Sequence, residues 1–215
     1  MSVTSYNVFN VIYLIFRLAP IIFVSYFLLQ SMFNLDPRGA IYLVGLLIGT
    51  IVTISASYML EKGLGDDLMS PPNHRCNTFY LGAIPIGTGG SIQPLSKAPL
   101  NILVYAYTLA YLVTSFTAPP VTYANALIAL QQNVAILVIF PLLLIFEALW
   151  LMNNSCNSVV FMMISLIIGI GWGIGWAYSI RSTKRADLQY LNIGNVEVCS
   201  RPSKTIYRCK NINTT

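Results

Sequence analysis

The apolar stretch Val159–Ile180, VVFMMISLIIGIGWGIGWAYSI, runs directly into the basic segment Arg181-Ser-Thr-Lys-Arg185. The stretch carries no charge. An apolar helix of about 20 residues is long enough to cross the hydrocarbon core of a bilayer. Basic residues that flank such a helix tend to remain on the cytoplasmic side. This junction therefore predicts a membrane-crossing helix whose C-terminal end faces the cytoplasm.

The composition of the whole chain agrees with a membrane protein. Of the 215 residues, 56% are apolar and 9% are charged, and the mean hydropathy is +0.68. A soluble domain typically carries about 25% charged residues. Seven of the twelve Lys and Arg residues follow Ile180, which favours a contact with anionic lipid headgroups. Nucleic acid is not an expected partner, because Asp187 and Glu197 interrupt this basic tail and it contains no nucleic-acid motif.

Five apolar blocks predict an all-α membrane protein with about five transmembrane helices and a small C-terminal β-hairpin tail. The expected spans are residues 9–33, 40–60, 100–118, 134–152 and 159–180. They form a helical bundle over residues 1–180, with a long loop at 61–99, and the basic tail covers residues 181–215. The first span should remain as an anchor rather than be cleaved as a signal peptide, because no Lys or Arg precedes it and Arg17 interrupts it. Residues 121–133 are interpreted as an interfacial helix or a connection.

An odd number of spans puts the two chain ends on opposite sides of the membrane. We call the side of the N-terminus side A and the side of the tail side B. Side B then holds eight basic residues, Arg38 and seven in the tail, and side A holds three, Lys62, Arg75 and Lys97. This excess favours side B as cytoplasmic. If spans three and four formed one hairpin that does not cross, the number of crossings would fall.

Arg17 and Glu147 are the two charged residues inside the expected spans. Counted from side A, they lie at similar depths, within roughly 6 Å of each other at 1.5 Å per residue. A charge in lipid costs several kcal/mol unless it is paired or reaches the interface. We expect the two to pair. Such a pair is consistent with a structural salt bridge or a proton or ion path, and the alternative is that the two side chains reach the interface separately.

The last span contains two series of small residues at helical spacing, which let helix backbones approach closely in lipid. They are Gly169, Gly173 and Ala177, and Gly171, Gly175 and Ser179. They indicate helix packing, either within the bundle or between copies in a homo-oligomer.

Neither a cofactor nor a metal ion is expected, and the chain is not predicted to be an enzyme. His74 is the single histidine and gives no metal or acid–base cluster. The loop around Gly82, Gly87, Gly89 and Gly90 lacks the Gly-Lys-Ser/Thr ending of a phosphate-binding loop.

The four cysteines fall into two candidate disulfide pairs. Cys76 and Cys156 both belong to side A. Cys199 and Cys209 flank an alternating segment that reads as a hairpin, and a turn near Lys204 would set them opposite each other. Cytosolic thiols normally stay reduced, so two free thiols are the alternative on side B.

The tail segment Cys199-Ser-Arg-Pro-Ser-Lys-Thr-Ile-Tyr-Arg-Cys209 resembles a signature of small polytopic membrane proteins of large icosahedral DNA viruses of algae, the phycodnavirus-like group. Pro94-Leu-Ser96 followed by Tyr105-Ala-Tyr-Thr-Leu-Ala-Tyr111 resembles the same group, although members are expected to continue further beyond the second cysteine. The resemblance covers about a third of the chain. It implies a minor capsid protein of the virion's internal membrane, and a viral thiol oxidase that would permit a disulfide on side B.

We therefore expect a structural protein of a double-stranded DNA virus. Its spans would anchor it in an internal membrane derived from the host endoplasmic reticulum, and its tail or long loop would bind capsid proteins. The rival hypothesis is a small transporter, channel or membrane enzyme that uses Arg17 and Glu147.

Overall fold

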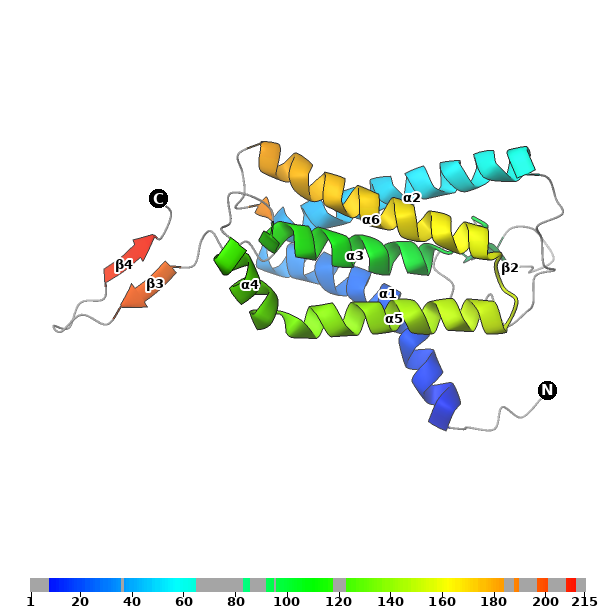
Figure 1. Ribbon diagram of the computed structural model, residues 1–215, viewed down its shortest axis with the longest axis horizontal. Coiled ribbons are helices and arrows are strands. Elements are labelled where there is room, and N and C mark those ends of the chain that lie inside the picture. The colour runs from blue at the N-terminus through cyan, green and yellow to red at the C-terminus, as the bar shows by residue number, and fades with distance from the viewer. Residues whose placement is uncertain are drawn as a thin grey trace.

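The structure is a computed structural model of the chain. It describes residues 8–35, 37–64, 83–85, 92–94, 96–117, 123–183, 188–189, 197–200 and 208–211. Most of the described residues are helical, and the helices lie side by side in one bundle (Figure 1).

Five helices are long and apolar enough to cross a membrane, within the part of the chain that the structure describes. They are α1 (Val8–Asn34), α2 (Pro37–Leu64), α3 (Leu100–Thr117), α5 (Val134–Asn153) and α6 (Val159–Ser182). This architecture is that of a multi-pass membrane protein. The expected spans are matched closely except in α2, which continues for four residues past Leu60 and so shortens the long loop.

Between α3 and α5 lies the short helix α4 (Tyr123–Gln132), where the sequence suggested an interfacial helix or a connection. The helix of ten residues is too short to cross a bilayer. α3 and α5 are joined through it and run in opposite directions (Figure 1).

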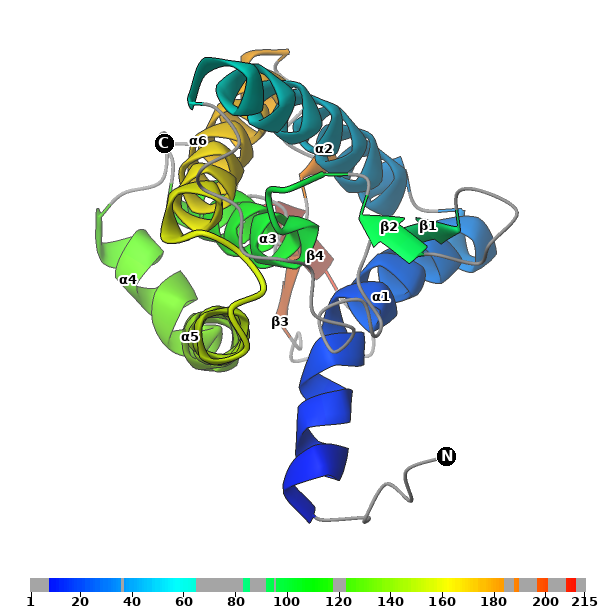
Figure 2. The same cartoon turned by 90° about the vertical axis from the view of Figure 1, so that its right-hand side faces the viewer.

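Helix α3 occupies the centre of the bundle. Viewed along the bundle, it is surrounded by α2, α6, α5 and α1, and its most extensive contact is with α6 (Figure 2). Fourteen of its eighteen residues are buried. Large exposed apolar side chains occur on α1, α2, α5 and α6 but not on α3. The four outer helices thus present an apolar surface suited to lipid, while α3 supplies the core.

Two tryptophans fasten α6 to α2. The Nε1 group of Trp172 donates a hydrogen bond to the carbonyl of Gly45 over 2.9 Å, and that of Trp176 donates to the carbonyl of Ile41 over 3.1 Å. Gly45 and Gly49 leave the room that the indoles occupy, because a Cβ at either position would collide with them. Indole N–H groups in lipid need such acceptors, since no water is present to replace them.

The two series of small residues on α6 face different ways. A Cβ on Gly169 would lie 2.8 Å from the Cβ of Ala106, and one on Gly173 would lie 2.7 Å from the carbonyl oxygen of Tyr107. Gly169 and Gly173 therefore form the close contact with α3, and Ala177 of the same series is buried. Gly171 and Gly175 have open space around them and face outward.

Two pairs of short antiparallel strands complete the described structure. β1 (Ala83–Pro85) pairs with β2 (Ile92–Pro94) in the segment between α2 and α3. β3 (Glu197–Ser200) pairs with β4 (Arg208–Asn211) in the tail. The residues that would close the predicted C-terminal hairpin, 201–207, lie outside the described residues.

Candidate functional site

The structure brings Arg17 of α1 and Glu147 of α5 together inside the bundle. The Nη1 atom of Arg17 lies 3.4 Å from Oε1 of Glu147, and the two residues are 1% and 4% exposed. The amide Nδ2 of Asn101, on α3, donates to the same carboxylate oxygen over 3.0 Å. The charge pair therefore ties three helices together, and the amide stabilises the carboxylate where water is absent.

Pro20 accounts for the local shape of α1 beside this pair. A proline inside a helix has no N–H to donate to the carbonyl four residues earlier, which here is that of Phe16. The hydroxyl of Tyr105, on α3, donates to this freed carbonyl over 3.0 Å. α1 is bent, and its first turns leave the bundle (Figures 1 and 2). The tyrosine bond satisfies the carbonyl next to Arg17, so the bend and the ion pair are parts of one arrangement.

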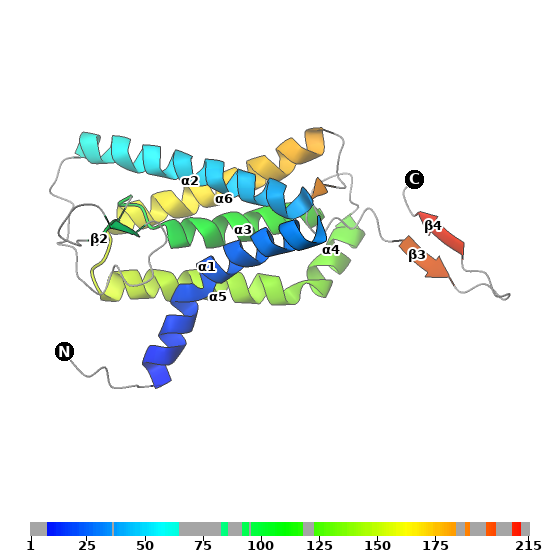
Figure 3. The same ribbon diagram turned by 180° about the vertical axis from the view of Figure 1, so that it is seen from behind.

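Seen from behind, α1 crosses α5 and then continues alongside α3 (Figure 3). The stacked rings of Phe16 and Phe146 mark this crossing, with centroids 4.8 Å apart. Phe23 and Phe140 form a second stacked pair between the same helices, with centroids 5.1 Å apart. Aromatic stacking thus holds α1 on α5 on either side of the bend.

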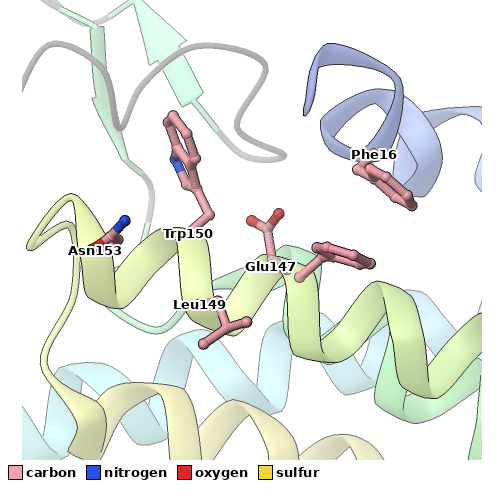
Figure 4. A pocket seen from close by; sticks show the side chains of 6 residues that line it. Phe16, Glu147, Leu149, Trp150 and Asn153 are labelled. Atoms are coloured by element: carbon pink, nitrogen blue, oxygen red, sulfur yellow. The ribbon is translucent and has the colours of Figure 1, made fainter. Parts of the chain in front are cut away.

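A pocket of about 200 Å³ adjoins the ion pair between α1 and α5. Its lining residues are Phe16, Phe146, Glu147, Leu149, Trp150 and Asn153. The Glu147 carboxylate points away from α5 into the space between Phe16 and Trp150 (Figure 4). The pocket is therefore mostly apolar, with one buried carboxylate at its inner wall.

The other polar side chains of α3 bond mainly to nearby backbone carbonyls. Tyr107 donates to the carbonyl of Tyr42 over 3.0 Å, and Thr108 donates to that of Val104 over 2.6 Å. Ser115 donates to the carbonyl of Tyr111 over 2.7 Å. Each bond ends on the backbone, so these hydroxyls do not form a chain of side chains leading from Glu147 across the bundle. The exception is one hydrogen bond between side chains, which joins the hydroxyls of Tyr42 and Thr108 over 2.6 Å.

Of the four cysteines, the structure describes Cys156, Cys199 and Cys209. Cys156, in the turn after α5, is disulfide-bonded. Cys76, its predicted partner, lies outside the described residues, so this pairing stays a prediction. In the strand register of the tail, the Cα atoms of Cys199 and Cys209 are direct partners. Directly opposed cross-strand residues have the Cα separation that a disulfide requires.

His74 and the glycines of the long loop, Gly82, Gly87, Gly89 and Gly90, also lie outside the described residues. The described part of the chain contains no group of three or more His, Cys, Asp and Glu side chains that could hold a metal ion.

Two functional features were missed from the sequence. Asn101 is the third member of the charge cluster, and a lone amide near the start of a span gave no distinctive signal. The Trp–Gly contacts did have a signal. Gly45 and Gly49 are four residues apart on one span and Trp172 and Trp176 are four apart on another, as complementary faces require.

No protein-family model, curated protein or solved structure matches this chain. The resemblance of its tail to viral membrane proteins stays a prediction.

Proposed function

We propose that this chain is a structural membrane protein rather than an enzyme. It anchors the internal membrane of a large double-stranded DNA virus, derived from the host endoplasmic reticulum, to the capsid shell as a minor capsid protein. The observation that carries the structural role is the enclosure of α3. A central helix with fourteen buried residues, held by direct backbone contact with α6 and by hydrogen bonds to α1 and α2, favours a rigid anchor.

The charge cluster supports the same role. Arg17 is bonded within the bundle, and Oε1 of Glu147 accepts from both Arg17 and Asn101. A transport path usually needs further polar groups that lead away from such a pair. Among the described side chains of α3, the remaining hydroxyls bond mainly to carbonyls close by. The cluster is thus suited to fixing three helices in register.

The basic tail is the proposed contact with capsid proteins. It leaves α6 on side B, and its strands β3 and β4 set Cys199 opposite Cys209. A hairpin closed by this pair would be a small rigid element able to bind outside the membrane. Its formation on side B requires an oxidant, which the viral resemblance implies.

The test uses assembled particles, with mass mapping of Cys199 and Cys209 under non-reducing conditions and protease digestion of the tail before and after the outer protein is stripped away. A disulfide-closed tail that becomes cleavable only after stripping is the expected result. A tail located on the genome side of the membrane, or free thiols on a tail that is always accessible, would contradict the proposal.

A small transporter is the second candidate, and the pocket beside Glu147 is the observation that favours it. A transporter needs the pair for activity, so activity should be lost in the Arg17→Leu and Glu147→Leu variants and equally in the double variant. A structural pair predicts partial recovery in the double variant.

A further inference from the structure

The pocket between α1 and α5 has no part in the proposed anchoring role. Its outer rim is apolar and faces the lipid, since Phe146 is 47% and Leu149 is 57% exposed. Its inner wall holds the carboxylate of Glu147, which is 4% exposed. We propose that this pocket binds the ammonium headgroup of a zwitterionic phospholipid from the side-A leaflet.

The depth of the pocket fits a lipid headgroup. Glu147 lies six residues before the end of α5 at Asn153, which is roughly 9 Å along a helix. The first turns of α1 run across the direction of the other helices from a point partway along α5 (Figure 1). Phe16 stacks on Phe146 at this crossing, and the other lining residues of the pocket continue from there toward the side-A end of α5. Trp150 is a residue of the type that is enriched where headgroups meet hydrocarbon.

The chemistry of the lining favours a cation. An ionised carboxylate only accepts hydrogen bonds. Arg17 and Asn101 both donate to Oε1 of Glu147. The carboxylate is directed into the pocket between Phe16 and Trp150 (Figure 4). Aromatic faces attract ammonium groups, and quaternary ammonium ligands are held in proteins by aromatic side chains.

The lining also disfavours an anionic headgroup. Lys and Arg are absent from the described residues that line the pocket, and the side chain of Arg17 is 0% exposed. Arg17 is paired with Glu147, so a phosphatidylglycerol headgroup would meet no exposed Lys or Arg among the described lining residues. Phosphatidylcholine and phosphatidylethanolamine share the ammonium that the pocket is suited to receive, and an acyl chain can follow the exposed side chains of Phe146 and Leu149. This inference is independent of any viral role, because it concerns only the bundle and its bilayer.

The experiment measures which lipids the intact protein retains. The chain is reconstituted in nanodiscs of equal parts phosphatidylcholine, phosphatidylethanolamine and phosphatidylglycerol, and the lipids still bound after release are identified by native mass spectrometry. The two ammonium lipids should be enriched over phosphatidylglycerol. Phe146→Leu keeps the apolar rim but removes an aromatic face, and should lower this enrichment about three- to tenfold.

Phe33→Leu is the matched control, because Phe33 is 80% exposed at the opposite end of α1 and should leave the enrichment unchanged. Glu147→Gln keeps an acceptor for Arg17 and Asn101 but removes the negative charge, and it should abolish the preference for ammonium lipids. If that variant fails to fold, the comparison of Phe146→Leu with Phe33→Leu still tests the proposal. Equal enrichment in Phe146→Leu and Phe33→Leu, or preferential retention of phosphatidylglycerol, would overturn the proposal. Binding of tetramethylammonium as strongly as the lipids would overturn the assignment to a lipid.

Discussion

At the scale of single residues, Pro20 and Arg17 take part in one local arrangement on α1, although they appear unrelated in the sequence. The proline frees the Phe16 carbonyl, and Tyr105 satisfies it. The next residue, Arg17, then meets Glu147 on the neighbouring helix. Two features that are individually costly in lipid, an unpaired carbonyl and a charge, are thus both satisfied at the crossing of α1 with α3 and α5.

The ion pair makes the first prediction. Arg17→Leu leaves a buried, uncompensated carboxylate, and Glu147→Leu leaves a buried guanidinium. Each single change should lower the free energy of unfolding by about 3–5 kcal/mol. The double variant removes both charges and should recover much of that loss, which thermal unfolding in detergent micelles would measure. A double variant as unstable as the sum of the two single variants would show that the charges do not stabilise each other.

At the scale of elements, α6 carries two series of small residues that differ only in the face they occupy. Gly169 and Gly173 approach α3 so closely that a Cβ would not fit. Ala177, the next member of this series, is buried. Gly171 and Gly175 face open space. The bundle's tightest helix contact therefore depends on small residues of the first series, and the second series is not needed for it.

A matched pair of substitutions on α6 tests this assignment. Gly173→Ala places a Cβ 2.7 Å from the backbone oxygen of Tyr107, which cannot move away without shifting α3, so it should cost about 1–3 kcal/mol. Gly175→Ala meets nothing within 4 Å and should be neutral or stabilise the helix by about 0.5–1 kcal/mol. The melting temperatures of the two variants in the same detergent would separate them. Equal shifts in both would contradict the packing of α6 on α3.

The segment after α6 is fastened back to the bundle. Gln189 is fully buried, and its Nε2 donates to the carbonyl of Ala177 over 2.6 Å. Gln189→Met keeps the length of the side chain but loses this bond, worth about 0.5–1.5 kcal/mol. Cleavage by trypsin at Lys184 and Arg185 should then become about two- to tenfold faster, as local opening becomes more frequent.

Gln132→Met is the control for the Gln189 variant, because Gln132 is exposed at the end of α4. Unchanged cleavage rates in both variants would show that the Gln189 bond does not hold this segment.

The spans were predictable because an apolar block of membrane length leaves few alternatives, and the pairing of Arg17 with Glu147 followed from their similar depths. The face of α6 that packs inward could not be predicted, because both series of glycines have the same spacing. They differ only in that one series contacts α3 and the other does not. Asn101 and the bond from Tyr105 to Phe16 depend on the lateral order of the helices, which periodicity does not contain. The residues that carry the viral resemblance belong to the tail, to positions 94–96 and to the middle of α3, and they do not indicate the lateral order of the helices.

At the scale of the whole molecule, the distribution of basic residues favours one orientation. Side B carries eight basic residues and side A carries three, which favours side B as cytoplasmic. Cys156 lies in the turn between α5 and α6, on side A, and it is disulfide-bonded. Disulfides persist in oxidising compartments. Because the tail cysteines on side B are also proposed to form a disulfide, the cysteines do not decide the orientation.

The orientation yields the last prediction. Five crossings require that the N-terminus and the turn containing Cys156 share one side, and that the C-terminal tail lies on the other. In sealed membrane vesicles with side B outward, a C-terminal tag should be digested by added protease, whereas an N-terminal tag should survive until detergent is added. A tag inserted at Asn154 should behave like the N-terminal one. If the tags at both chain ends were digested together, the number of crossings would be even, so the five helices could not all cross. The charge count on each side would then have to be reassigned.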